Sequence, residues 1–157
     1  MYDVSSEEVH ITDLDVICPT VNKVGSKSHQ DLQRAQQLAE GAFKVLQWYQ
    51  PKQIYVEVPH GSQSARAMAS YAMCLGILGS MRALQFDFVE VTQSQVKMAA
   101  VGKKDATKEQ MIEWAVHRHA EAPWPKRKLN KEEVIQKGRA EHMADAIGAM
   151  HAGLEII

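Results

Sequence analysis

Three side chains that lie far apart in the chain could together hold a metal ion. His142 and Asp145 are three residues apart in Arg139–Met150, an Ala- and Met-rich segment typical of a helix, so both would point the same way from it. Glu57 lies near the end of Gln53–Val58, a short run rich in β-branched and apolar residues. A carboxylate at the end of a buried strand and a His/Asp pair on a helix suit a hard divalent cation used in phosphate chemistry.

Each of these residues also has an ordinary structural interpretation. Glu57 could equally be a surface or salt-bridged group, and a histidine on an apolar helix is more often a satisfied core or surface residue than a ligand. Asp145 is harder to explain in this way, because a carboxylate on so apolar a helix face is costly unless it is paired or bound to metal. The three residues taken together favour the functional interpretation.

Basic side chains are concentrated between two acidic parts of the chain. The net charge is −1, yet residues 96–139 carry 11 basic and 6 acidic side chains, whereas residues 1–95 carry 7 basic and 10 acidic ones. This distribution fits a polyanion guided onto a carboxylate site. Taken alone, the basic segment is better explained as a Lys-rich solvated surface.

Length and composition indicate one ordinary globular domain over residues 1–157. No apolar run approaches the roughly 18 residues that a membrane span needs, and the acidic N-terminus is unlike a signal peptide. Cys18 and Cys74 form no metal-binding motif by themselves. We therefore expect a reduced, cytoplasmic setting.

The elements that must position these side chains follow from the hydrophobic pattern. In the first half we expect a strand over residues 9–17 with Met1–Val4 as its hairpin partner, a helix over 28–50 that Pro51 ends, a strand over Gln53–Val58 and a helix over 63–82. Helix 63–82 is apolar on almost every side, which predicts burial on more than one face, against the core or a partner subunit.

The second half predicts a strand, two short helices and a long final helix. We place them at Phe86–Val91, 93–99, 105–119, and from near Lys131 to about Gly153, with Lys126–Lys128 as a basic linker. Trp124 is interpreted as a packing anchor, and His117, His119 and His151 as ordinary helix residues. The order of strands and helices is typical of an α/β layered fold with a mixed sheet.

These segments resemble the RuvC family of Holliday-junction resolvases, within the RNase H-like superfamily, and most of all its divergent phage-like members. The similarity extends from the strand at residue 9 to the C-terminus. It is carried by Gln53–Val58 followed by Ser64–Ala67, by Ser94–Lys97 with Val101–Gly102 and Lys108, and by His142 with Ala144–Ala146, where the family's last acidic motif has Asp or His first. The order of the pieces is specific, although no single piece is.

The resemblance implies a three-layer RNase H-like α/β fold with a mixed central sheet flanked by helices. It implies a metal-dependent endonuclease that resolves four-way junctions or other branched DNA by paired phosphodiester cleavage, as a homodimer formed through helix 63–82. The residues that it implies are Glu57, His142 and Asp145 as catalytic ligands of Mg²⁺ or Mn²⁺, and Lys97, Lys103, Lys104 and Lys108 as DNA contacts.

The chain departs from the family pattern at one point. The family's first strand carries an Asp in a Gly-x-Asp context, and this sequence has no such segment, although Asp3, Asp13 and Asp15 lie near its start. Three interpretations stay open: a sequence that begins late, an inactive protein that binds branched DNA, or a first hairpin that brings Asp3 inward. A different RNase H-like nuclease, acting on RNA or an RNA–DNA hybrid, is a further alternative.

Overall fold

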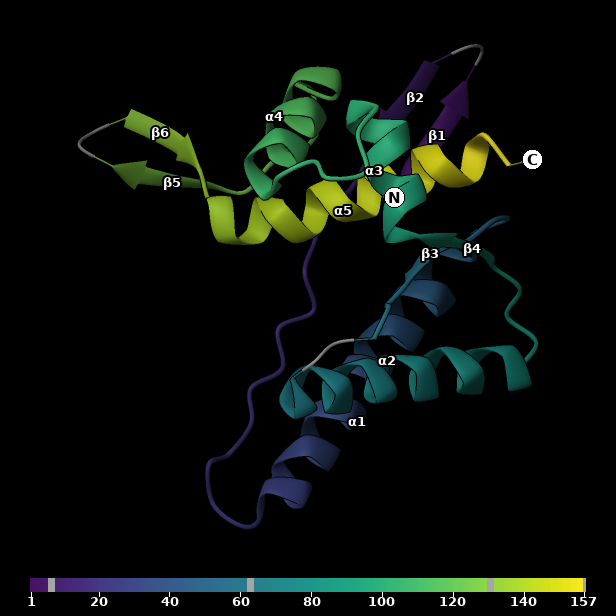
Figure 1. Ribbon diagram of the computed structural model, residues 1–157, viewed down its shortest axis with the longest axis vertical. Coiled ribbons are helices and arrows are strands. Elements are labelled where there is room, and N and C mark those ends of the chain that lie inside the picture. The colour runs from purple at the N-terminus through teal and green to yellow at the C-terminus, as the bar shows by residue number, and fades with distance from the viewer. Residues whose placement is uncertain (6–7, 62–63, 130–131, 157) are drawn as a thin grey trace. The chain divides into compact units, whose positions relative to one another are not determined.

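A computed structural model describes residues 1–5, 8–61, 64–129 and 132–156 (Figure 1). The elements follow the order β1 (Tyr2–Ser5), β2 (Glu8–Ile11), α1 (Lys27–Tyr49), β3 (Tyr55–Val58), α2 (Ala65–Ala83), β4 (Val89–Thr92), α3 (Gln93–Val101), α4 (Lys108–Arg118), β5 (Lys126–Leu129), β6 (Glu132–Ile135) and α5 (Lys137–Leu154).

The predicted α/β class is confirmed. Within the described ranges the strands form three two-stranded sheets, β1–β2, β3–β4 and β5–β6, and not one continuous mixed sheet.

The chain divides into two compact units. The first unit contains Met1–Val16, Tyr55–Glu57 and Glu90–Ile157, and the second contains Ile17–Ile54 and Val58–Val89. Glu57, Asp145 and all four candidate DNA-contacting lysines belong to the first unit. That residues 1–157 act as a single domain stays a prediction.

Helix α5 forms the centre of the first unit. It packs against α3 and α4, which also contact each other (Figure 1). Its buried face consists mostly of small and flexible apolar residues, among them Ala140, Ala144, Ile147 and Met150. Gly148 lets α5 approach α3 closely, since a Cβ atom there would come within 2.8 Å of the Val96 side chain. Burial of this face, at about 25 cal/mol per Å² of apolar surface, is the main force that holds the unit together.

Capping boxes define where α3 and α4 begin. The Thr92 side chain accepts from the Gln95 backbone N–H while the Gln95 side chain accepts from the Thr92 N–H, and Thr107 and Gln110 repeat this arrangement. Such reciprocal bonds satisfy N–H groups that the first turn of a helix leaves unpaired. They therefore position α3, which carries Lys97, and α4, which begins at Lys108.

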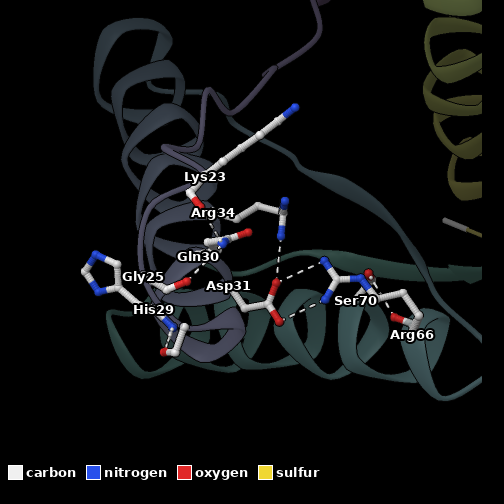
Figure 2. Close-up of polar contacts among 9 residues, drawn as sticks. Lys23, Gly25, His29, Gln30, Asp31, Arg34, Arg66 and Ser70 are labelled. Carbon is white, nitrogen blue, oxygen red and sulfur yellow. Dashed lines mark hydrogen bonds and ion pairs between the residues drawn. The ribbon is translucent and has the colours of Figure 1, made fainter.

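In the second unit, α1 and α2 are joined by a charged network. The Asp31 carboxylate accepts two hydrogen bonds from the Arg66 guanidinium, at 2.9 and 3.0 Å, and one from Arg34 at 2.7 Å (Figure 2). The Arg66 guanidinium lowers the pKa of Asp31, because its hydrogen bonds favour the ionised carboxylate. The predicted helix over 28–50 is confirmed by α1, and its C-cap is Gln50, immediately before Pro51.

The prediction that helix 63–82 is buried on more than one face is wrong for the chain by itself. Met81 is the one residue of α2 that is buried, whereas Met68 and Leu75 are 43% and 48% exposed. The physical reason is that the second unit has only α1 to pack along this helix within the described ranges. An apolar helix with one neighbour leaves its other faces open.

The predicted strand over 9–17 is shorter than expected. β2 ends at Ile11, and residues 12–17 form neither strand nor helix. The hairpin itself is confirmed, with β1 and β2 antiparallel and Tyr2 opposite Ile11. Residues 6 and 7 of its expected turn lie outside the described residues. No described helix is long and apolar enough to cross a membrane.

The largest error concerns residues 126–136. The expected basic linker is β5, and the expected start of the final helix is β6, so that α5 begins only at Lys137. The two strands pair antiparallel, Lys126 Nζ lies 3.9 Å from a Glu133 carboxylate oxygen, and the Gln136 N–H donates to the Pro125 carbonyl at 2.8 Å. Lys and Glu favour helices locally, but cross-strand pairing outweighs this weak preference here.

Candidate metal and nucleic-acid site

In the first unit the charge of Asp145 acts on Glu57. Glu57 is the third residue of β3, and Asp145 lies in the middle of α5, next to the buried Ala144. Both carboxylates are half-buried. Burial raises the pKa of Glu57, the Asp145 charge raises it further, and Lys97 lowers it. These are the signs of two like charges held together with partial compensation by a lysine.

Asp145 lies in a strongly charged setting. Burial raises its pKa first, and Glu141, one turn earlier on α5, raises it further. His142, Lys108 and Lys97 act in the opposite direction and favour the ionised form. Cationic groups from α3, α4 and α5 all act on Asp145, which partly offsets the cost of a carboxylate on this apolar helix.

The donor set determines which kind of metal site is chemically reasonable. Among the described residues, no group of three or more His, Cys, Asp or Glu side chains is arranged to hold a metal ion. Two carboxylates nevertheless fit Mg²⁺ chemistry, since Mg²⁺ often binds one or two carboxylates and completes its octahedron with water and substrate phosphate. Glu57 and Asp145 fit such a shared site, whereas a closed all-protein cage does not fit the described residues.

His142 is placed differently from the two carboxylates. It is exposed on α5, three residues before Asp145, and its charge lowers the pKa of that carboxylate. It does not join Glu57 and Asp145 in a cluster of three ligands within the described ranges. Its role as a metal ligand stays a prediction.

The four candidate DNA-contacting lysines fall into two environments. Lys97 on α3 is half-buried, and its charge acts on both carboxylates. Lys103 and Lys104 are exposed between α3 and α4. Lys108, the first residue of α4, has a side chain that is 71% exposed and an Nζ atom 2.5 Å from a Glu141 carboxylate oxygen. The basic segment is therefore not a uniform surface: one lysine compensates the acidic pair and three face solvent.

Two pairings were not found by sequence reasoning. Glu141, the partner of Lys108, was not singled out. The interpretation of His119 and His151 as ordinary helix residues is also wrong, since their Nε2 atoms lie 2.8 Å apart in a hydrogen bond and His119 is only 3% exposed. No sequence signal links positions 32 residues apart on two different helices.

Trp124, in contrast, is a packing anchor as predicted. It is 6% exposed, and its indole N–H donates to the His119 carbonyl at 2.8 Å.

The comparisons with known proteins agree with this fold. A solved structure of RuvC from Thermus thermophilus is similar to the chain with a TM-score of 0.55, over 84% of this chain and 74% of that chain, at 15% sequence identity. The chain therefore has an RNase H-like fold similar to that of this structure. No curated protein sequence matches the chain.

The family follows from the sequence match. Residues 4–120 match the family described as crossover junction endodeoxyribonuclease RuvC. The chain belongs to the RuvC family of Holliday-junction resolvase-type nucleases, which confirms the resemblance found in the sequence. The matched region includes Glu57, Lys97 and Lys108, whereas His142 and Asp145 lie beyond its end.

Proposed function

We propose that the chain is a divalent-metal-dependent endonuclease that cleaves branched DNA, with four-way junctions as the preferred substrate. Family membership supplies the reaction class. The observation that carries the proposal is the Glu57–Asp145 pair, two half-buried carboxylates on which the charge of Lys97 acts, with the charge of Lys108 acting on Asp145 as well. Holding two like charges together costs stability, and such a cost is typical of a functional site.

The residues would divide the work as follows. A bound Mg²⁺ or Mn²⁺ would activate water and stabilise the leaving 3′ oxygen during in-line attack on the phosphodiester. Glu57 and Asp145 would hold the cation from β3 and α5, and Lys97 would compensate their charge when no cation is bound. Lys108, Lys103 and Lys104 would bind backbone phosphates near the scissile bond without reading sequence. His142 would complete the metal site or help to order the attacking water.

The experiment is a cleavage assay with the full chain and Mg²⁺ or Mn²⁺. Substrates are a synthetic four-way junction, a duplex of the same arms, and an RNA–DNA hybrid of equal length. We expect paired nicks in the junction and little cutting of the duplex. Preferential cutting of the hybrid would instead support an RNase H-like nuclease acting on RNA.

A second candidate function is an inactive protein that binds branched DNA. The observation that favours it is the absence, among the described residues, of a third carboxylate or histidine grouped with Glu57 and Asp145. Junction binding with no cleavage under any of these metal conditions would establish this function and refute the first one.

We also infer a homodimer through α2, since paired cleavage of a four-way junction needs two equivalent active sites. The support is the exposed apolar surface of α2, including Met68 and Leu75. Sedimentation of the wild type is expected to give a dimer, and Leu75→Glu is expected to give a monomer. Leu129→Glu, on exposed β5, is the control that should leave the dimer intact. A monomeric wild type would contradict the inference.

A further inference from the structure

Lys108, the first residue of α4, is joined to a carboxylate of its own chain. Its Nζ atom lies 2.5 Å from Glu141 Oε1. The two side chains differ in accessibility: that of Lys108 is 71% exposed, whereas that of Glu141 is 27% exposed. The lysine can therefore move away into solvent, whereas most of the Glu141 side chain is covered.

The Glu141 carboxylate contacts the same ammonium group to which a phosphate would bind. A lysine ammonium binds a carboxylate and a phosphate oxygen through the same charge-assisted hydrogen bonds. Lys108 also stands at the N-terminus of α4, where the helix dipole disfavours a cation and favours an anion. The Glu141 carboxylate is stabilised by the Lys108 ammonium, and a phosphate bound to the same ammonium would be stabilised in the same way.

We propose that Glu141 is an intramolecular competitor that holds Lys108 in the free protein and must release it when a DNA phosphate binds. This inference rests on the proposed DNA-binding function. Each binding event exchanges the Glu141 contact for a phosphate contact, so Glu141 weakens DNA binding and makes it less dependent on salt. The protein therefore binds duplex or junction DNA with lower affinity, which favours release of the product after cleavage.

The size of the effect follows from the exposure of the pair. Breaking a surface ion pair of this kind changes an equilibrium by about two- to fivefold. Salt weakens the Lys108–Glu141 pair as well as the Lys108–phosphate pair, so the two salt dependences partly cancel in the wild type. In a variant without the Glu141 charge, binding should show the full counterion release expected for one phosphate contact. The slope of log K against log salt should then be steeper than in the wild type by up to about 0.9.

The test measures junction binding by fluorescence anisotropy, in EDTA and over a range of salt concentrations. The variant is Glu141→Gln, and its matched control is Glu113→Gln, which removes one exposed carboxylate from α4 and changes the net charge equally. We expect Glu141→Gln to bind about two- to fivefold more tightly than Glu113→Gln at low salt, with the steeper slope. In a Lys108→Met background the two variants should bind equally, because the contact that Glu141 competes for is gone.

Three results would overturn the proposal. Glu141→Gln could bind no more tightly than Glu113→Gln, it could bind less tightly than the wild type, or its gain could persist in the Lys108→Met background. The second result would mean that Glu141 positions Lys108 for the phosphate and does not compete with it. A wild type that binds no DNA would refute the proposed function together with this inference, whereas equal binding by the two Gln variants refutes the inference alone.

Discussion

Gly153 on α5 packs against the aromatic ring of Tyr55 on β3 so closely that a Cβ atom at position 153 would overlap the ring carbons. Tyr55 is two residues before Glu57 on β3, and α5 also carries Asp145. This contact therefore sets the spacing between the two elements that bring the carboxylates together.

Gly153→Ala is expected to destabilise the protein by about 1–3 kcal/mol, because the added methyl forces β3 and α5 apart. The same displacement should lower cleavage by separating Glu57 from Asp145. Chemical denaturation gives the free energy of unfolding, and the junction assay gives the rate. Gly138→Ala, in the first turn of α5 with open space around its Cβ, is the control and should stabilise by about 0.5–1 kcal/mol. Equal effects of the two substitutions would contradict the spacing role of Gly153.

Asp145→Asn is expected to abolish cleavage while junction binding survives. The substitution keeps the shape of the side chain and removes one of the two charges that would hold the cation. Without metal, the substitution should also raise the free energy of unfolding by on the order of 1 kcal/mol. The reason is that it removes a half-buried charge, whose burial raises the pKa of Asp145 and is therefore unfavourable in the folded chain. Glu155→Gln, an exposed carboxylate at the end of α5, is the control. Undiminished cutting by Asp145→Asn would refute the site.

Lys108→Ala and Lys97→Ala are both expected to weaken DNA binding uniformly across sequences. For exposed Lys108 the slope of log K against log salt should become flatter. The change should be smaller than the full value for one phosphate contact, because Glu141 already offsets part of the Lys108 charge. Lys97→Ala should in addition raise the pKa values of Glu57 and Asp145, since it removes a charge that lowers both. Filter binding at several salt concentrations measures the slopes. An unchanged slope for both variants would count against a DNA-binding role for the basic segment.

The His119–His151 pair predicts acid sensitivity of the first unit. Burial lowers the pKa of His151 to about 4, and it also lowers the pKa of His119. Below about pH 6.5 the histidines of the unfolded chain take up protons that the folded pair does not, so the free energy of unfolding falls as the pH drops from about 6.5 towards 4. For His151 the loss is at most about 3 kcal/mol, and less where solvent screens the partly exposed ring.

Denaturation curves at pH 7.5, 6 and 5 measure this dependence. His151→Gln should flatten it, since one of the two titrating groups is removed, and His117→Gln, an exposed histidine on α4, should leave it unchanged. A pH dependence that His151→Gln leaves intact would show that other groups are responsible.

Much of the local structure could be predicted because it depends on neighbouring residues. The end of α1 before Pro51 and the hairpin of β1 and β2 follow from backbone chemistry within a few positions. The β5–β6 hairpin could not be predicted in this way, because Lys- and Glu-rich segments are compatible with either helix or strand. Their partner across the hairpin, in the register Lys126 opposite Ile135, decides between the two.

The sequence by itself determined the α/β class, the RuvC-family membership and the identity of Glu57, Asp145, Lys97 and Lys108 as candidate residues. Only the tertiary structure decided their environments: that the Lys97 charge acts on both carboxylates, that Lys108 pairs with Glu141, and that His119 bonds to His151. The physical reason is distance along the chain. Propensity and periodicity act over a few residues, whereas these charges and rings meet only after α3, α4 and β3 have packed onto α5.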